Sequence, residues 1–197
     1  METSAKQDRS KERINKIIDA AINIVEDGEI DDLTLAKVAE KSGLKRTSTY
    51  KFIPTVDFLK GLIISKCIDE CLENFSKNIL SESDKGDLIK VTNYIIFNIY
   101  EYFFNSSIAQ KLILSNTINP PLDSDSIRQL GSVIQETYEE SISLENVFNK
   151  EGVCRVVAQI ILSIFSLNTK ESGKLNDVGK IEASRAVVAY MTSWTKK

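Results

Sequence analysis

Apolar residues recur at every third or fourth position over most of this chain, which is the spacing of one buried face of an amphipathic helix. The first run extends from Ile14 to Val25, and Gly28 is expected to end its helix. Residues 87–105 are apolar on nearly every side, as in a buried helix. Further runs cover residues 57–80, 107–115, 127–138, 153–167 and 181–194. The pattern predicts an all-α fold of about nine helices.

A helix-turn-helix pattern follows the first of these runs. Thr34 can cap a short helix, and Leu33 and Val38 can pack together across its first turn. Gly43 is expected to end this helix, because glycine adopts the left-handed conformation that reverses the chain at little steric cost. A second short helix over residues 45–52 should then cross the first.

The second short helix carries cationic and hydroxyl side chains at its outward positions. They are Arg46, Thr47, Ser48 and Lys51, which can reach base edges and phosphate oxygens together. The chain has a net charge of −3, yet residues 37–51 hold five cations and one carboxylate, a local sum of 5 − 1 = +4. A basic run is usually only a solvated helix face. Its coincidence with the turn pattern favours DNA binding for residues 37–51.

Another basic run precedes the turn pattern. Residues 6–16 hold five cations and two carboxylates, a sum of 5 − 2 = +3, and they could form an arm or a first helical turn near phosphates. No recognition pattern coincides with this run, so a solvated helix face is the simpler interpretation there. The acidic residues within 26–32 lie between the two basic runs and are expected to face away from DNA.

Residues 34–59 resemble the DNA-binding domain of TetR-family transcriptional regulators, whose pattern is approximately T-x-x-x-I-A-x-x-A-G-V-S-x-x-x-x-Y-x-x-F-x-x-K-x-x-L. The family residue stands at five positions, and a residue of similar size stands at four more. The identical positions are Thr34, Ala39, Gly43, Tyr50 and Leu59, and the similar ones are Val38, Ser42, Leu44 and Ile53. Lys45 replaces the usual capping Ser, and Val56 replaces the usual Lys.

The resemblance implies a three-helix DNA-binding domain over residues 1–54 and a larger helical domain for effector binding and dimerisation over residues 55–197. It also implies that a homodimer binds a pseudo-palindromic operator in double-stranded DNA. The residues expected to contact DNA are Thr34, Lys45, Arg46, Thr47, Ser48, Tyr50 and Lys51. The long helix over residues 57–80 would connect the two domains.

The apolar helix over residues 87–105 contains more aromatic and amide side chains than one buried stripe requires. An effector pocket lined by these side chains is one interpretation, and simple filling of the core is the other. The candidate effector-binding residues are Tyr94, Phe97, Asn98, Tyr100 and Phe104. No Lys or Arg lies between Val91 and Gln110, so the expected effector is small, largely apolar, and neutral or cationic.

The helix over residues 153–167 has two apolar stripes, and one domain cannot easily cover both. The resemblance implies that the last two helices form a four-helix bundle with those of a second subunit. The residues expected at this dimer interface are Val153, Val157, Ile160, Ile161, Ile164, Val188 and Met191.

Several classes of protein fit the sequence poorly. The apolar run at residues 156–167 is too short to span a membrane and contains polar residues, and residues 1–13 have no apolar stretch behind their charges, so a cytoplasmic protein is expected. Cys67 and Cys71 are expected to be reduced core residues; a redox or metal-sensing pair is the alternative, although two thiolates without a third ligand make a poor zinc site. No metal or other cofactor is expected.

The absence of histidine and of any phosphate-cradling or nucleophile motif argues against an all-helical enzyme. The sequence therefore favours a DNA-binding transcriptional regulator, most simply a ligand-responsive repressor. The alternative is a ligand-independent architectural or protein-regulated DNA-binding protein of the same fold.

Overall fold

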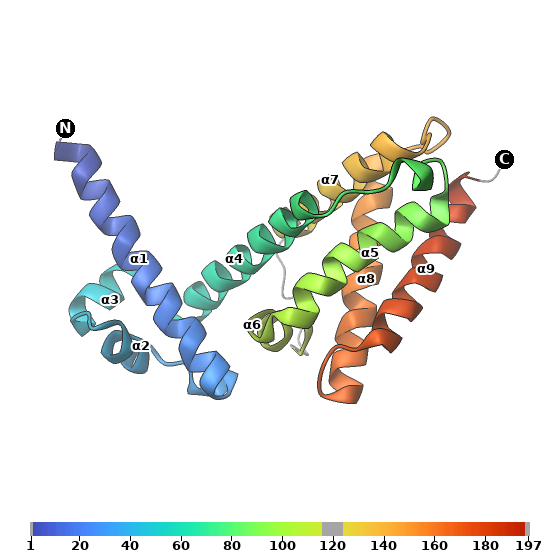
Figure 1. The fold of residues 1–197 in the computed structure, drawn as a ribbon. Coiled ribbons are helices and arrows are strands. Elements are labelled where there is room, and N and C mark those ends of the chain that lie inside the picture. Colours follow the sequence, from blue (N-terminus) through green and yellow to red (C-terminus); the bar gives the residue numbers. More distant parts are fainter. Residues whose placement is uncertain (1, 116–123, 196–197) are drawn as a thin grey trace. The chain divides into compact units, whose positions relative to one another are not determined.

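The computed structural model describes residues 2–115 and 124–195, which contain nine α-helices and no β-strand (Figure 1). The all-α class predicted from the periodicity is confirmed. The chain divides into two compact units, residues 1–66 and 67–197. The division falls inside helix α4 (Val56–Lys77), whereas the sequence suggested a boundary between residues 54 and 55. Helix α4 therefore contributes to both units.

The first unit consists of four helical segments before α4 and the first half of α4. These segments are α1 (Glu2–Asp27), the 3₁₀-helix η1 (Ile30–Asp32), α2 (Leu35–Ser42) and α3 (Arg46–Phe52). Helix α2 packs against both α1 and α3. Their apolar faces meet in a core whose fully buried members are Ile17, Ala21, Val25, Val38, Ile53, Leu59 and Ile63.

Local capping interactions fix the ends of the short helices. The Thr34 side chain accepts a hydrogen bond from the Lys37 amide at 3.2 Å, so the predicted cap of α2 is confirmed. Gly43 ends α2 with φ = 68°, the left-handed conformation that the turn requires. The Thr55 hydroxyl accepts a hydrogen bond from the Phe58 amide at 3.0 Å and caps the start of α4. These contacts fix both ends of α2 and the start of α4.

The second unit is a helical bundle. Its segments are the remainder of α4, the 3₁₀-helix η2 (Glu82–Asp84), α5 (Leu88–Asn105), α6 (Ser107–Ala109), the π-helix η3 (Gln110–Leu114), α7 (Ser124–Ser141), α8 (Lys150–Ser172) and α9 (Asp177–Thr195). Helix α7 packs against α8, and α9 packs against both α5 and α8 (Figure 1). The largest fully buried side chains of this core are Tyr138, Phe103 and Phe165.

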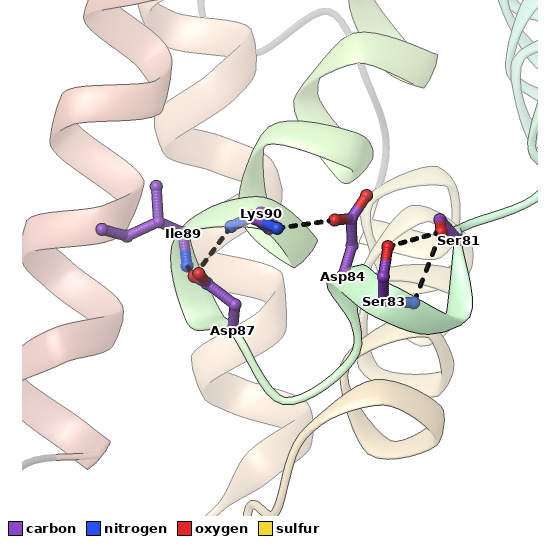
Figure 2. Close-up of polar contacts among 6 residues, drawn as sticks. All are labelled: Ser81, Ser83, Asp84, Asp87, Ile89 and Lys90. Atoms are coloured by element: carbon purple, nitrogen blue, oxygen red, sulfur yellow. Dashed lines mark hydrogen bonds and ion pairs between the residues drawn. The ribbon is translucent and has the colours of Figure 1, made fainter.

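The connection between α4 and α5 is held by a series of polar contacts (Figure 2). Asp87 caps α5, because its carboxylate accepts hydrogen bonds from the amides of Ile89 and Lys90 at 2.9 and 3.2 Å. The Lys90 ammonium lies 2.8 Å from the Asp84 carboxylate. The Gly86 amide donates to the Ser141 carbonyl at 2.7 Å, which joins this connection to the end of α7.

Ser106 caps the start of α6, because its hydroxyl accepts a hydrogen bond from the Ala109 amide at 3.3 Å. The Gln110 side chain donates to the Phe104 carbonyl at 3.2 Å and accepts from the Leu175 amide at 2.9 Å. Gln110 thus links α5 to the loop before α9.

Helix α8 is long and apolar enough to cross a membrane by length and composition alone, with a mean hydropathy of 1.5. Half of that apolar stretch is buried inside the bundle. A core helix of a globular unit has the same properties, and α8 occupies that position here.

Candidate nucleic-acid interface

The outward side of α3 presents the side chains that the turn pattern predicted. Lys45, Arg46, Thr47 and Lys51 are exposed, and the Tyr50 ring is about half exposed, at 49%. Thr49 is fully buried on the opposite side. The helix therefore packs through one side and leaves cationic, hydroxyl and aromatic groups accessible on the other.

A surface groove of about 550 Å³ runs beside α3. It is lined by Arg13 of α1, by the turn after α2, and by one side of α3. The lining residues are Arg13, Gly43, Leu44, Lys45, Thr47, Ser48 and Lys51. Four of the seven residues predicted to contact DNA line this groove, namely Lys45, Thr47, Ser48 and Lys51. Thr34, Arg46 and Tyr50 are not among its lining residues.

The cations of the first unit fall into two groups. Lys37 pairs with Asp32 at 2.7 Å, and Lys41 pairs with Asp27 at 2.9 Å. The hydrogen bond from Lys37 holds the pKa of the Asp32 carboxyl below its ordinary value. Two of the five cations counted in residues 37–51 are therefore compensated by the acidic stretch at residues 26–32.

The second group has no ion-pair partner among the described residues. Arg13, Lys45, Arg46 and Lys51 belong to it, and three of these four line the groove. Charge left uncompensated at a groove is available for an anionic partner, and a phosphate backbone is such a partner. Within residues 37–51, the cations that form no ion pair with a described residue are thus Lys45, Arg46 and Lys51, at the start of α3 or within it.

Arg13 is a groove residue that the sequence did not single out. Its run of cations at residues 6–16 was interpreted most simply as a solvated helix face, with a position near phosphates as the alternative. The signal was present in the charge count, but only the packing of α1 against α2 brings Arg13 to the groove. The other exposed cations of this run for which side chains are described are Arg9, Lys11 and Lys16, and they are not groove-lining.

The start of α3 has no capping side chain. Lys45 occupies the cap position with the extended backbone of a cap, φ = −63° and ψ = 139°, but its side chain forms no capping hydrogen bond. The replacement of the family's usual Ser by Lys therefore removes a local cap and adds a cation to the groove.

The five candidate effector-binding residues differ in their burial. Asn98 and Tyr100 are buried and Tyr94 is half-buried, while the Phe97 and Phe104 rings are exposed. The Tyr94 hydroxyl donates to the Asn78 carbonyl at 2.8 Å. The Asn98 amide donates to the Tyr94 carbonyl at 2.8 Å. The polar groups expected to need a ligand are therefore satisfied by protein atoms.

Helix α9 also changes the environment of this set. Lys180 lies 4.6 Å from the centre of the Tyr100 ring, and burial raises the pKa of Tyr100 to about 12. No cation was expected near these rings, because no Lys or Arg lies between Val91 and Gln110. The contact comes from a residue 80 positions later in the chain, which no local pattern can reveal.

Four of the seven residues predicted at the dimer interface are buried within the single chain. Val153, Val157, Ile161 and Met191 belong to its own core. Ile160, Ile164 and Val188 are half-buried. The exposed apolar side chains of α8 and α9 are instead Val156, Leu167, Val178, Ile181 and Trp194. The exposed apolar side chains of these helices therefore lie beside the predicted set and not within it.

The cysteine thiols are buried. Cys67 and Cys71 lie on the inner side of α4, and burial raises the pKa of the Cys71 thiol far above its ordinary value. A protonated, buried thiol is a poor nucleophile and a poor metal ligand. Within residues 2–115 and 124–195, no group of three or more His, Cys, Asp or Glu side chains could hold a metal ion.

Comparison with known proteins identifies the fold. No sequence family model and no curated protein matches the chain. A TetR-family regulator from Streptomyces coelicolor is 14% identical, with a TM-score of 0.65 over 95% of this chain and 99% of its own. A TetR regulator from Rhodococcus sp. RHA1 is 11% identical, with a TM-score of 0.68 over 94% of this chain and 98% of its own.

A third solved structure is the multidrug binding protein EbrR complexed with imidazole. It is 16% identical, with a TM-score of 0.65 over 90% of this chain and 94% of its own. The similarity extends over both units, although the sequence pattern alone covered only residues 34–59. The chain therefore has the fold of TetR-family transcriptional regulators, from the helix-turn-helix to the last helix.

Proposed function

We propose that this protein is a DNA-binding transcriptional regulator that acts as a homodimer on a pseudo-palindromic operator. The groove beside α3 carries the proposal, because three cations that form no ion pair with any described residue line it together with Thr47 and Ser48. The fold shared with TetR-family regulators supports the same conclusion. The protein is proposed to act by binding, not by catalysis, and in the cytoplasm.

Helix α3 would enter the major groove of B-DNA, which is wide enough to admit a helix. Arg46, Thr47 and Ser48 stand at its start, where side chains can reach base edges. Lys45 and Lys51 would bind phosphate oxygens, and Thr34 and Tyr50 would support the backbone contact. Two such helices, about 34 Å apart, would read the two half-sites of the operator.

Dimerisation would use the exposed apolar side chains of α8 and α9. Val156 and Leu167 of α8 are 43% and 56% exposed, and Val178 and Ile181 of α9 are 60% and 48% exposed. Because α8 and α9 pack against each other, pairing with a second copy would form a four-helix bundle. The half-buried Ile160, Ile164 and Val188 would lie at its edges.

An effector is proposed to bind inside the second unit, away from the exposed Phe97 and Phe104. The Thr169 hydroxyl of α8 is buried and has no hydrogen-bond partner among the described residues. A buried unpaired hydroxyl costs free energy, which a ligand or a water would recover. EbrR, a multidrug binding protein of similar fold, was solved in complex with imidazole, which supports a small organic molecule as the effector.

The protein would be a repressor if the effector prefers the conformation that does not bind DNA. A ligand shifts such an equilibrium only by its difference in affinity for the two states. The alternative function keeps the DNA-binding unit and omits the effector. The satisfied hydrogen bonds of Tyr94 and Asn98 favour this alternative, because they remove one of the reasons to expect a ligand along α5.

Selection of bound sequences from a random pool of double-stranded DNA tests the proposal. The expected result is enrichment of an inverted repeat whose half-sites are one helical turn or a multiple apart. Failure of the full chain to enrich any sequence, together with no salt-dependent binding to random DNA, would refute the proposed function. A screen of small apolar compounds for release of the selected DNA then separates the repressor from the ligand-independent alternative.

A further inference from the structure

Arg13 occupies a defined position at the groove although it belongs to the first helix. The next turn of α1 contains Ile17, which is fully buried in the core of the first unit, and Ile14 is half-buried. These neighbours fix the rotation of α1 about its axis. The Arg13 side chain is consequently directed to the groove by packing, and its guanidinium group remains exposed.

The pairing of charges in the first unit separates Arg13 from structural cations. Lys37, Lys41 and Lys66 each bind a carboxylate of α1 or of the segment after it. Arg13 has no ion pair among the described residues and lies in one groove with Lys45 and Lys51. Three like charges around one groove repel one another, and an anion bound in the groove would relieve this repulsion.

We propose that Arg13 is a phosphate-binding residue that, with Lys45 and Lys51, holds one stretch of the DNA backbone beside α3. The inference rests on the proposed DNA-binding function. A guanidinium group can bind a phosphate through two parallel hydrogen bonds, which gives the contact a defined orientation. Because α1 lies outside the recognition helix, Arg13 reads no base and fixes how α3 is seated in the major groove.

The contact predicts a specific dependence on salt. Each phosphate contact contributes about 0.9 to the slope of log K against log salt for B-DNA. The Arg13→Ala variant should lose about one such unit from the slope. The ratio of wild-type to variant affinity should then fall roughly 3- to 4-fold between 50 and 200 mM salt. The loss should be equal on the operator and on unrelated DNA, so the specificity ratio should not change.

Lys11 provides a matched control on the same helix. It is exposed, has the same charge, forms no ion pair among the described residues, and is not a groove residue. A two-residue separation places it on nearly the opposite side of the helix from Arg13. Lys11→Ala should leave the slope unchanged, and Arg13→Lys should retain most of it. Thermal unfolding should be the same for all variants, since neither side chain is buried.

The experiment measures DNA affinity by fluorescence anisotropy at several salt concentrations for the wild type and the three variants of the full chain. If the wild type binds no DNA, the proposed function fails and the role of Arg13 fails with it. If the wild type binds and Arg13→Ala keeps its slope, only the Arg13 assignment is overturned. An equal loss in Lys11→Ala would also overturn it, because the effect would then reflect net charge and not the groove.

Discussion

The hydroxyls of Thr92 in α5 and Tyr138 in α7 form a hydrogen bond of 2.8 Å, and both residues are fully buried. The two residues are 46 positions apart in the sequence, so the bond joins two helices that are not consecutive along the chain. Burial also raises the pKa of Tyr138 well above its ordinary value, so the phenol remains protonated at physiological pH. Each hydroxyl is the hydrogen-bond partner of the other inside the core of the second unit.

Removing one member of this pair should cost more than removing both. Tyr138→Phe leaves the Thr92 hydroxyl buried without a partner, which should lower the free energy of unfolding by about 1–3 kcal/mol. Thr92→Val should have a similar effect through the Tyr138 hydroxyl. The double variant should lose less than the sum of the two, and urea unfolding followed by the fluorescence of Trp194 in the same unit measures the difference. Strict additivity would mean that the bond contributes no coupling.

A capping residue at the start of α3 should stabilise the first unit. Lys45→Ser places a hydroxyl at a position whose backbone already has the extended conformation of a cap, so a gain of about 1 kcal/mol is expected. Hydrogen exchange of the α2 and α3 amides measures it within the full chain. Lys45→Ala is the control and should give no gain. The same Ser variant should bind DNA less tightly at low salt, which separates stability from affinity.

Arg46 and Lys51 should differ in their effect on DNA recognition. If Arg46 binds a guanine, Arg46→Ala should cost about 1–3 kcal/mol on the operator and relax the preference at one base pair. Lys51→Ala should weaken binding to all sequences alike and reduce the salt slope by about one unit. Affinity measurements on operators with single base changes distinguish the two patterns. Unchanged binding by both variants would contradict the assignment of α3 as the recognition helix.

The compensated lysines should contribute little to DNA affinity. Lys37→Ala removes a cation that Asp32 already neutralises, so the salt slope should remain close to that of the wild type. Lys51→Ala removes a groove cation that has no ion pair in the described part of the chain, and it should reduce the slope. The two variants change the net charge equally, which makes each the control of the other. Equal slopes in the two variants would show that position in the groove has no influence.

The dimer surface can be tested by comparing an exposed with a buried position on α8. Leu167→Glu changes a side chain that is 56% exposed, so the variant should fold and be monomeric. Val157→Glu places a carboxylate in the core of the bundle and should instead unfold the second unit. Light scattering gives the mass and circular dichroism gives the helix content. A wild type that is already monomeric at micromolar concentration would contradict the proposed dimer.

Features that depend on neighbouring residues could be predicted from the sequence. The Thr34 cap and the left-handed Gly43 are examples, because each involves atoms within a few positions of one another. Helix periodicity is local in the same sense, and the all-α class followed from it. The outward side of α3 was also predictable, since the helical repeat places Thr49 on one side of the helix and the exposed residues on the other.

Features that depend on packing between distant segments could not be predicted. Helix α8 has two apolar stripes, and only the positions of α7 and α9 determine that Val157 is buried while Val156 is exposed. The hydrogen bonds of Asn98 to Asn74 of α4 and to Asn78 just after α4 could not be predicted, because these residues lie 24 and 20 positions away in the sequence. Arg13 reaches the groove for a similar reason, through the packing of α1 and not through its own sequence pattern.

The row of amide contacts between α4 and α5 allows only one alignment of these helices. Asn98 donates to the Tyr94 carbonyl through its amide nitrogen, and its amide oxygen accepts from Asn78 at 2.6 Å. Its main-chain carbonyl accepts from Asn74 at 3.0 Å. Sliding the helices by a fraction of a turn would leave several of these groups unpaired at once, because the same residue holds all of them. We therefore expect the end of α4 to be either fully docked against α5 or released from it, with no stable intermediate position.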